Sequence, residues 1–227
     1  MGLVLALAAF LIAWNNLANL VPAFETAYVG VNLAVTAGVL AVARRRGLDW
    51  PEMGLGSDRM GAGLRWGGAA FVLVALGLMA ALVLPATRPW LADARIAGLG
   101  AGELAWLALV RIPLGTVVLE EVAFRGVLLG AWARRRSIRE ALVGQAAVFG
   151  LWHITPTWIA LEAGAFAVAP LARVAVIAAA VVITGVAGVL FGWLRLRSGS
   201  VLAPALAHVG TNSLAAVAGF TALRLGS

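Results

Sequence analysis

Long apolar stretches constrain this sequence more than any other of its features. Several of them approach or exceed the roughly 18 to 20 residues that a helix needs to cross about 30 Å of hydrocarbon. Because 63% of the 227 residues are hydrophobic and only 12% are charged, a soluble fold would have too little polar surface. The sequence therefore predicts an all-α fold, a polytopic transmembrane helical bundle of about seven spans, at residues 3–21, 27–43, 66–84, 103–132, 138–153, 171–194 and 201–220.

The basic residues indicate how these spans are oriented. All 17 are arginines, and most gather after the second, fourth and sixth spans. With seven alternating spans these clusters fall on one side of the membrane, and the positive-inside rule makes that side cytoplasmic. We therefore expect a multi-pass protein of the cell inner membrane with a cytoplasmic N-terminus and no nucleic-acid partner. The clusters are Arg44, Arg45 and Arg46; Arg134, Arg135, Arg136 and Arg139; and Arg195 and Arg197.

One segment of the fourth span, LEEVAFRGVLLG, carries three ionisable residues. Glu120 and Glu121 lie about 13 residues before Arg134, which is roughly 20 Å from the cytoplasmic end of their helix. A charge at that depth costs at least about 2.5 to 3.5 kcal/mol, so such residues usually face the bundle interior and carry function. Glu121 and Arg125 share a helix face and are expected to pair. Glu120 points about 100° away and is expected to stay free of the arginine.

Both histidines of the chain lie within predicted spans. His153 ends the sequence FGLWH, and His208 begins the sequence HVGTN, in which Asn212 follows by one helical turn on the same face. A lone histidine on an apolar face is more often a packed core residue than a catalyst. For the glutamates, the corresponding structural interpretation is an ion pair that holds helices together. Because both histidines of the chain lie at a depth comparable with that of the Glu pair, a functional site is favoured instead.

These residue types fit hydrolysis by an activated water molecule. A carboxylate and an imidazole that converge on one water can deprotonate it, and a second imidazole beside a carboxamide can stabilise an oxyanion. The sequence has no cysteine, which excludes a thiolate nucleophile. A divalent metal such as zinc, held by Glu120, His153 and His208, is the alternative way to activate the water. Because no H-E-x-x-H pair exists, we favour the route without a metal cofactor.

The three motifs resemble those of the CPBP intramembrane proteases, the family named for CAAX proteases and bacteriocin-processing proteins and also called Abi. EEVAFRG is similar to the family motif E-E-x-x-x-R, FGLWH to F-x-x-x-H and HVGTN to H-x-x-x-N, in the family order. The resemblance implies an intramembrane endopeptidase, of glutamate type or metal-dependent, whose site lies inside the bundle and opens toward the cytosolic side. Its partners would be the lipid bilayer and a membrane-associated peptide or protein substrate.

The resemblance also implies roles for individual residues. It makes Glu120 and His153 the pair that activates water, and His208 and Asn212 the oxyanion stabilisers, with Glu121 and Arg125 in support. We accordingly divide the chain into N-terminal transmembrane helices (1–102) and a CPBP/Abi-like catalytic transmembrane core (103–222). The lysine-free composition, rich in Ala, Arg and Gly, indicates a GC-rich bacterial genome, where prenylated substrates are not expected.

Two classes of non-enzymatic membrane protein stand as alternatives. A proton-coupled transporter would use Glu120 and the histidines as a proton relay, but the chain is short and lacks paired half-repeats. A non-catalytic membrane scaffold or immunity protein would carry the same motifs without turning over a substrate. The intact motif set favours activity.

Two further residues have both a structural and a functional interpretation. Arg111 would meet carbonyl groups that the kink at Pro113 releases, or would bind substrate; the structural role is favoured. Trp152 would be a core or interfacial aromatic, or would wall the site beside His153; the first role is favoured.

Overall fold

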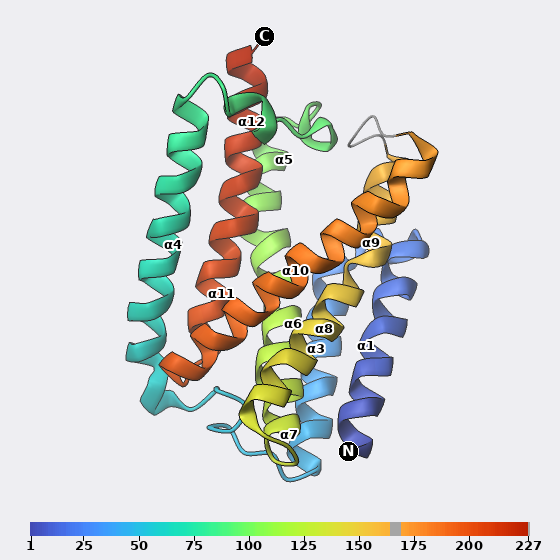
Figure 1. The fold of residues 1–227 in the computed structure, drawn as a ribbon, viewed down its shortest axis with the longest axis vertical. Helices are drawn as coiled ribbons and strands as arrows, with labels where there is room; N and C mark the ends of the chain where they lie inside the picture. The colour runs from blue at the N-terminus through green and yellow to red at the C-terminus, as the bar shows by residue number, and fades with distance from the viewer. Residues whose placement is uncertain (164–168, 227) are drawn as a thin grey trace.

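The computed structural model describes residues 1–163 and 169–226, and all regular elements within these ranges are helical (Figure 1). The expected all-α bundle of membrane type is confirmed. The α-helices are α1 (Gly2–Leu20), α2 (Ala23–Thr26), α3 (Tyr28–Arg45), α4 (Met60–Val83), α5 (Ala101–Trp106), α6 (Val118–Glu120), α7 (Leu129–Ala133), α8 (Ile138–Trp152), α9 (Ile154–Glu162), α10 (Pro170–Ser198), α11 (Leu202–Val209) and α12 (Ala215–Gly226). Short 3-10 turns η1 (Ser57–Arg59), η2 (Arg88–Leu91) and η3 (Ala94–Ile96) and π-helical segments η4 (Leu107–Val117), η5 (Glu121–Leu128) and η6 (Gly210–Leu214) complete the chain.

Each of the seven predicted spans is helical, although some ends differ. Helix α4 begins at Met60 rather than at residue 66, because its start, MGAGLR, contains two glycines and an arginine and the apolar stretch marks only the later part of the helix. Helix α10 continues to Ser198 and ends at Gly199, whose φ of 71° lies in the left-handed region that glycine favours at helix ends. Four helical stretches are long and apolar enough to cross a membrane: Gly2–Leu20, Ser57–Val83, Ala172–Ser198 and Leu202–Leu225.

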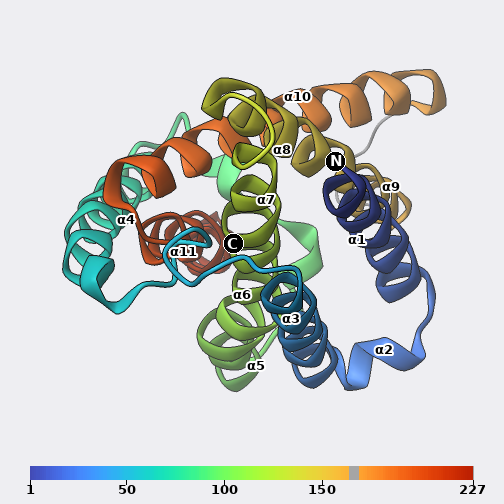
Figure 2. The ribbon, with the colours of Figure 1, turned by 90° about the horizontal axis from the view of Figure 1, so that it is seen from below.

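A continuous rod of residues 101–133, made of α5, η4, α6, η5 and α7, runs through the middle of the bundle (Figure 2). Pro113 cannot donate to the helix ladder and would kink an α-helix at this point. The rod accommodates it within the π-helical segment η4. Segment η5, which contains Glu121 and Arg125, and segment η6, which contains Asn212, are π-helical too, and such segments are frequent at functional sites.

A break between α8 and α9 was not predicted, and Pro156 accounts for it. A proline cannot donate a hydrogen bond to the carbonyl four residues earlier, which here belongs to Trp152. That carbonyl oxygen instead accepts a 2.6 Å hydrogen bond from the side-chain amide of Asn15 in α1. The hydroxyl of Thr155 donates to Asn16 Oδ1 at 2.6 Å. The first span is therefore attached to the fifth span beside His153, the residue at the break.

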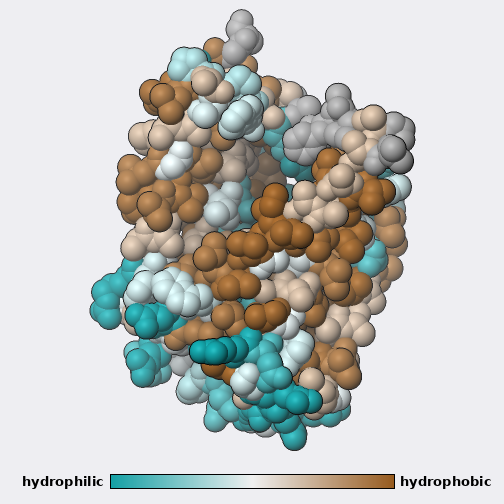
Figure 3. Space-filling model, viewed as in Figure 1, coloured by the Kyte–Doolittle hydropathy of each residue, from teal (hydrophilic) through white to brown (hydrophobic). Residues whose placement is uncertain are grey.

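The two ends of the bundle differ in character. Figure 1 places loops 46–56 and 134–137 together at one end, near the N-terminus, and Figure 3 shows hydrophilic surface concentrated there. The three arginine clusters flank these loops and the turn at 199–201. We call this the arginine end. The other, which we call the opposite end, carries the end of α4, the start of α5 and the end of α12.

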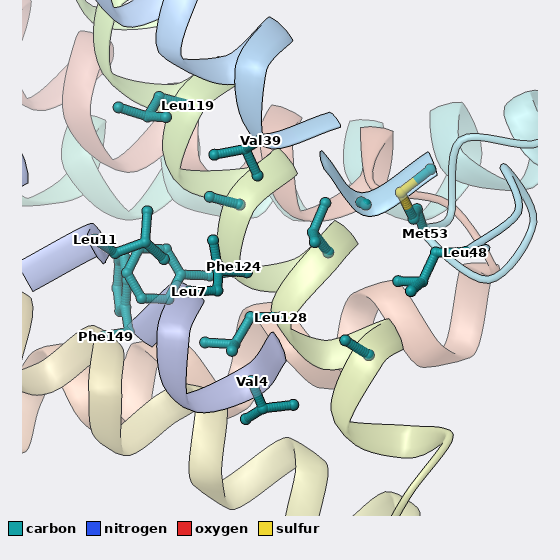
Figure 4. Packing of buried hydrophobic residues seen from close by; sticks show 14 of the residues in the cluster. Val4, Leu7, Leu11, Val39, Leu48, Met53, Leu119, Phe124, Leu128 and Phe149 are labelled. Atoms are coloured by element: carbon teal, nitrogen blue, oxygen red, sulfur yellow. The ribbon is translucent and has the colours of Figure 1, made fainter. Parts of the chain in front are cut away.

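The hydrophobic core lies between the middle of the bundle and the arginine end (Figure 4). It combines the first half of α1, the second half of α3 and the second half of the central rod. Phe124 at its centre packs edge-on against the rings of Phe149 and Trp152, with centroids 5.1 and 5.4 Å apart. The core contains Val4, Leu7, Leu11, Val39, Ala43, Leu48, Met53, Leu119, Ala123, Phe124, Val127, Leu128, Ala131, Phe149 and Trp152.

Loop 46–56 packs tightly onto the central rod at the arginine end. Its Leu48 and Met53 side chains are buried in the core. Arg134 forms an ion pair with Glu52, and Arg195 donates hydrogen bonds to the carbonyl oxygens of Pro51 and Glu52 at 3.2 and 2.6 Å. The loop comes so close to the rod that a glycine is required there.

We predict that Gly130→Ala destabilises the protein. An added Cβ would lie 2.8 Å from the carbonyl oxygen of Glu52, so the loop would have to move, at a cost of about 1 to 3 kcal/mol. Gly77→Ala is the matched control, since nothing lies within 4 Å of its added Cβ and alanine favours a helix interior. Thermal melts in detergent should show a lower Tm for Gly130→Ala alone, and equal melts of the two variants would contradict this packing.

The Glu52–Arg134 pair predicts an acid sensitivity of the same loop. The hydrogen bonds from Arg134 lower the pKa of Glu52 from an ordinary value of 4.5 to about 2. The pair therefore stabilises the fold fully above about pH 4.5, and this contribution is lost as the pH falls toward 2. Melts of the wild type and Glu52→Gln should differ at pH 7 and converge as the solution is acidified below pH 4.5. A difference that grows on acidification would show that another group is responsible.

Candidate active site

Glu121 and Arg125 form a fully buried ion pair. Arg125 Nη1 lies 2.8 Å from Glu121 Oε1, and neither side chain is exposed. This is the pairing that their i, i+4 spacing predicts. The same Glu121 oxygen also lies 2.8 Å from Nδ1 of His208, which reaches it from α11. One carboxylate oxygen thus joins the fourth and seventh spans.

Aromatic rings surround the Arg125 guanidinium. Its carbon Cζ lies 3.9 Å from the centroid of the Phe149 ring and 5.1 Å from that of Phe191. Among the described residues, its Nε and Nη2 atoms have no hydrogen-bond partner. Cation–π attraction at these rings therefore replaces part of the hydration that burial removes.

The contacts of His208 indicate its protonation. A carboxylate oxygen only accepts hydrogen bonds, so the 2.8 Å contact with Glu121 places a hydrogen on Nδ1. On the other side of the ring, Asn212 Nδ2 lies 3.1 Å from Nε2 and donates to it. The hydroxyl of Thr211 lies 3.3 Å from Asn212 Oδ1, which agrees with this orientation of the amide. In this arrangement Nδ1 of His208 donates to Glu121 and Nε2 accepts from Asn212.

Glu120 and Glu121 each have one buried carboxylate oxygen without a hydrogen-bond partner among the described residues, and they differ in what binds the other oxygen. Its Oε1 accepts a 3.1 Å hydrogen bond from the indole nitrogen of Trp152. Its Oε2 is buried, has no hydrogen-bond partner among the described residues, and lies 3.8 Å from His208 Nε2. No arginine in the described part of the chain pairs with this side chain. The free carboxylate that the sequence predicts is thus present, and Trp152 is both a core aromatic and a wall of the site.

His153 lies near this group but is not joined to it. The fourth and fifth spans do pack together, as their joint role requires. Nevertheless no hydrogen bond or ion pair links His153 to Glu120 in the ranges that the structure describes. Instead Nδ1 of His153 lies 2.8 Å from the Phe149 carbonyl oxygen, which must accept, so the ring's Nε2 is left as the basic nitrogen.

The metal alternative names Glu120, His153 and His208 as ligands. Within residues 1–163 and 169–226, no group of three or more His, Asp or Glu side chains is arranged to hold a metal ion. The described arrangement thus does not gather these three side chains into a ligand set. We derive no catalytic step through a metal.

Several polar residues of the site were missed in the sequence. A small cavity beside Glu120 and Trp152 has a volume of about 10 Å³. Its wall includes four side chains from the first two spans whose polar atoms stand in otherwise apolar helices. The signal was available, because WNNLANL puts three asparagines into an apolar stretch. The polar residues lining this cavity, besides Glu120 and Trp152, are Asn15, Asn19, Tyr28, Asn32 and Thr116.

Arg111 has a different environment from the one expected. Its guanidinium forms an ion pair with Glu25 at 3.0 Å and lies over the Tyr28 ring, 4.3 Å from the centroid. It thus contacts α2 and α3 rather than carbonyl groups released by Pro113, because the Glu25 carboxylate and the Tyr28 ring offer it an ion pair and a cation–π contact. These residues line a second cavity of about 390 Å³.

We predict that Glu121→Gln and Arg125→Ala each destabilise the protein by about 3 to 5 kcal/mol, because either change leaves a buried charge without its partner. Glu120→Gln should leave the fold intact, since the glutamine oxygen can still accept from Trp152. Thermal melts of the three variants in detergent measure the difference. Equal losses of stability would show that the two glutamates do not divide their roles in this way.

Comparison with known families agrees with the motifs and the geometry. The family model described as type II CAAX prenyl endopeptidase Rce1-like matches residues 102–214, a range that contains all three motifs. No curated protein and no solved structure gave a match. The match confirms the resemblance to the CPBP proteins. The chain therefore belongs to this Rce1-like family, and it is an intramembrane endopeptidase of the general CAAX-protease type.

Proposed function

We propose that the protein hydrolyses a peptide bond of a membrane-associated substrate with a water molecule that Glu120 activates. The observation that carries this proposal is the free oxygen Oε2 of Glu120, which is buried and 3.8 Å from His208 Nε2. The cavity of about 10 Å³ beside this residue is about the space that one water molecule needs.

The reaction follows from the hydrogen-bonding capacity of each group. Glu120 accepts a proton from the water as the water oxygen bonds to the substrate carbonyl carbon. The same carboxylic acid then returns the proton to the amide nitrogen as the C–N bond breaks, which leaves a carboxyl and an amine product. Trp152 keeps hold of the other carboxylate oxygen throughout, so the base retains its position.

Asn212 and His208 support the proposal as oxyanion stabilisers. The Asn212 amide uses one hydrogen for His208 Nε2, and its second hydrogen is available to a developing oxyanion. His208 accepts from the Asn212 amide at Nε2 and so fixes this amide in place, and its own role as an oxyanion stabiliser rests on the family motif.

His153 takes part, in this proposal, through its basic Nε2. The hydrogen bond from Nδ1 to the Phe149 carbonyl oxygen fixes the ring, so Nε2 is free to accept a hydrogen bond. A water molecule between the two residues could then donate one hydrogen to Glu120 and the other to His153. This assignment rests on the family motif and on the tautomer. The double variant described below tests whether His153 acts together with Glu120.

We predict that Glu120→Gln and His153→Ala each lower the rate of cleavage by at least about 100-fold, the usual effect of losing a general base. The double variant should be little worse than either single variant, because residues that act as a unit are not additive. Asn212→Ala should cost roughly 100- to 1,000-fold, as one oxyanion donor does. Glu162→Gln, the same chemical change at an exposed residue, is the control.

The measurement is cleavage of a membrane-peptide library by purified, reconstituted protein, with and without a chelator. Full activity in excess chelator would support the route that uses only the protein's own residues, and loss of activity restored by zinc would support the metal route. Near-normal cleavage by Glu120→Gln would refute the mechanism whatever the chelator does. No cleavage of any peptide by the wild type would favour a scaffold, immunity or transport role.

A further inference from the structure

Helix α1 reaches the candidate site although it lies outside residues 102–214, the range that the family model matches. Its Asn15 is 4% exposed and lines the small cavity beside Glu120. A buried amide without hydrogen bonds costs free energy, so an asparagine in an apolar span needs partners that satisfy it. The partners of Asn15 show which part of the site it holds.

The hydrogen bonds of Asn15 give its amide a single orientation. Nδ2 of Asn19, one turn further along α1, donates to Asn15 Oδ1 at 2.9 Å and to the Asn15 carbonyl oxygen at 2.8 Å. Because Oδ1 accepts this bond, Nδ2 of Asn15 points the other way, where it donates to the Trp152 carbonyl oxygen at 2.6 Å. Asn19 thus fixes the amide that extends from α1 to the fifth span.

Trp152 depends on this bond because it is the last residue of α8. Pro156 has no N–H to offer to its carbonyl oxygen, and the hydrocarbon interior of a bilayer offers no water in its place. The ring of the same residue packs edge-on against Phe124, and its indole N–H donates to Glu120 Oε1 at 3.1 Å. A backbone shift at Trp152 would therefore move the indole away from the carboxylate.

We propose that Asn15 is a positioning residue of the reaction: it holds Trp152 in the place from which the indole binds Glu120. The bound oxygen of Glu120 is Oε1, and the buried Oε2 then remains available to water. The inference rests on the proposed function, because it names the group that positions the proposed base. It gives the first span a part in turnover in addition to that of a membrane anchor.

Asn16 offers a matched control in the same helix. Its Oδ1 accepts a 2.6 Å hydrogen bond from the Thr155 hydroxyl, so it too joins α1 to the chain around the break. Among the described residues, the lining of the small cavity includes Asn15 and not Asn16. Asn15→Leu and Asn16→Leu therefore make the same chemical change in neighbouring interhelical bonds, and only the first removes the support of Trp152.

The first measurement follows Trp152 directly and needs no activity. Protein with ¹⁵N in its indole rings gives one N–H signal in a nuclear magnetic resonance spectrum for each of its nine tryptophans, and Trp152→Phe identifies the signal of Trp152. We expect Asn15→Leu to shift or broaden this signal and Asn16→Leu to leave it in place. An unchanged signal in Asn15→Leu, or an equal change in both variants, would overturn the proposal.

A second variant covers the case in which Asn15→Leu does not fold. Asn15→Ser removes the same interhelical bond, and a serine hydroxyl can instead bond to a carbonyl of its own helix, which an apolar span tolerates. The expected change of the Trp152 signal is the same, and an unchanged signal in this variant would likewise overturn the proposal.

The last measurement connects the position of Trp152 to turnover. With the reconstituted protein, Asn15→Leu should lower kcat about 10- to 100-fold and leave KM unchanged, because a misplaced base slows the chemical step and not binding. Asn16→Leu should leave both constants unchanged. In a Trp152→Phe background, Asn15→Leu should cause no further loss, since the residue acts through Trp152.

The outcomes separate this proposal from the proposed function. An unchanged kcat in Asn15→Leu, or a full further loss in the Trp152→Phe background, would refute the positioning role. Normal cleavage by Glu120→Gln would refute the proposed function instead, and the indole signal would still decide whether Asn15 holds Trp152 in place.

Discussion

The buried guanidinium of Arg125 is the group around which the rest of the bundle is arranged. A charge without exposed area is tolerable only where its partners are fixed, and here they come from four helical segments. Glu121 supplies the carboxylate from η5, and Phe149 and Phe191 supply ring faces from α8 and α10. His208 then binds the same carboxylate from α11. The rotation of each helix about its own axis is thereby coupled to one ion pair.

This arrangement explains why two adjacent glutamates behave differently. Oε1 of Glu121 contacts both a guanidinium and an imidazole and so joins helices, while its Oε2 is buried without a partner among the described residues. Glu120 faces the other way, where an indole N–H holds one oxygen and leaves the other free. Of the two glutamates, Glu120 is the one that borders the small cavity. The Glu121–Arg125 pair thus leaves Glu120 as the carboxylate available for the proposed chemistry.

The parts of this site that follow from spacing within one helix were predictable from the sequence. The Glu121–Arg125 pair needs only the i, i+4 rule, and the seven spans need only the length of apolar stretches. The gathering of Glu120, His208 and Asn212 was indicated by the rarity of polar groups at that depth. Contacts between helices were not predictable in detail, because the rotation and depth of one helix against another depend on packing. The bond from Trp152 to Glu120 is such a contact.

The break after His153 shows how local sequence and tertiary contact combine. Pro156 alone signals only that a carbonyl is released, and a released carbonyl in a membrane must find another donor. Asn15 provides it from a span whose hydropathy marks it as a simple anchor. Asn15 of α1 therefore has two roles at the site: it holds the fifth span beside His153, and it lines the cavity at Glu120. A reaction that uses water inside a bilayer needs polar side chains on one side of the site to hold the water. It also needs packed apolar side chains on the other side, because water entering from both ends would make the membrane leak.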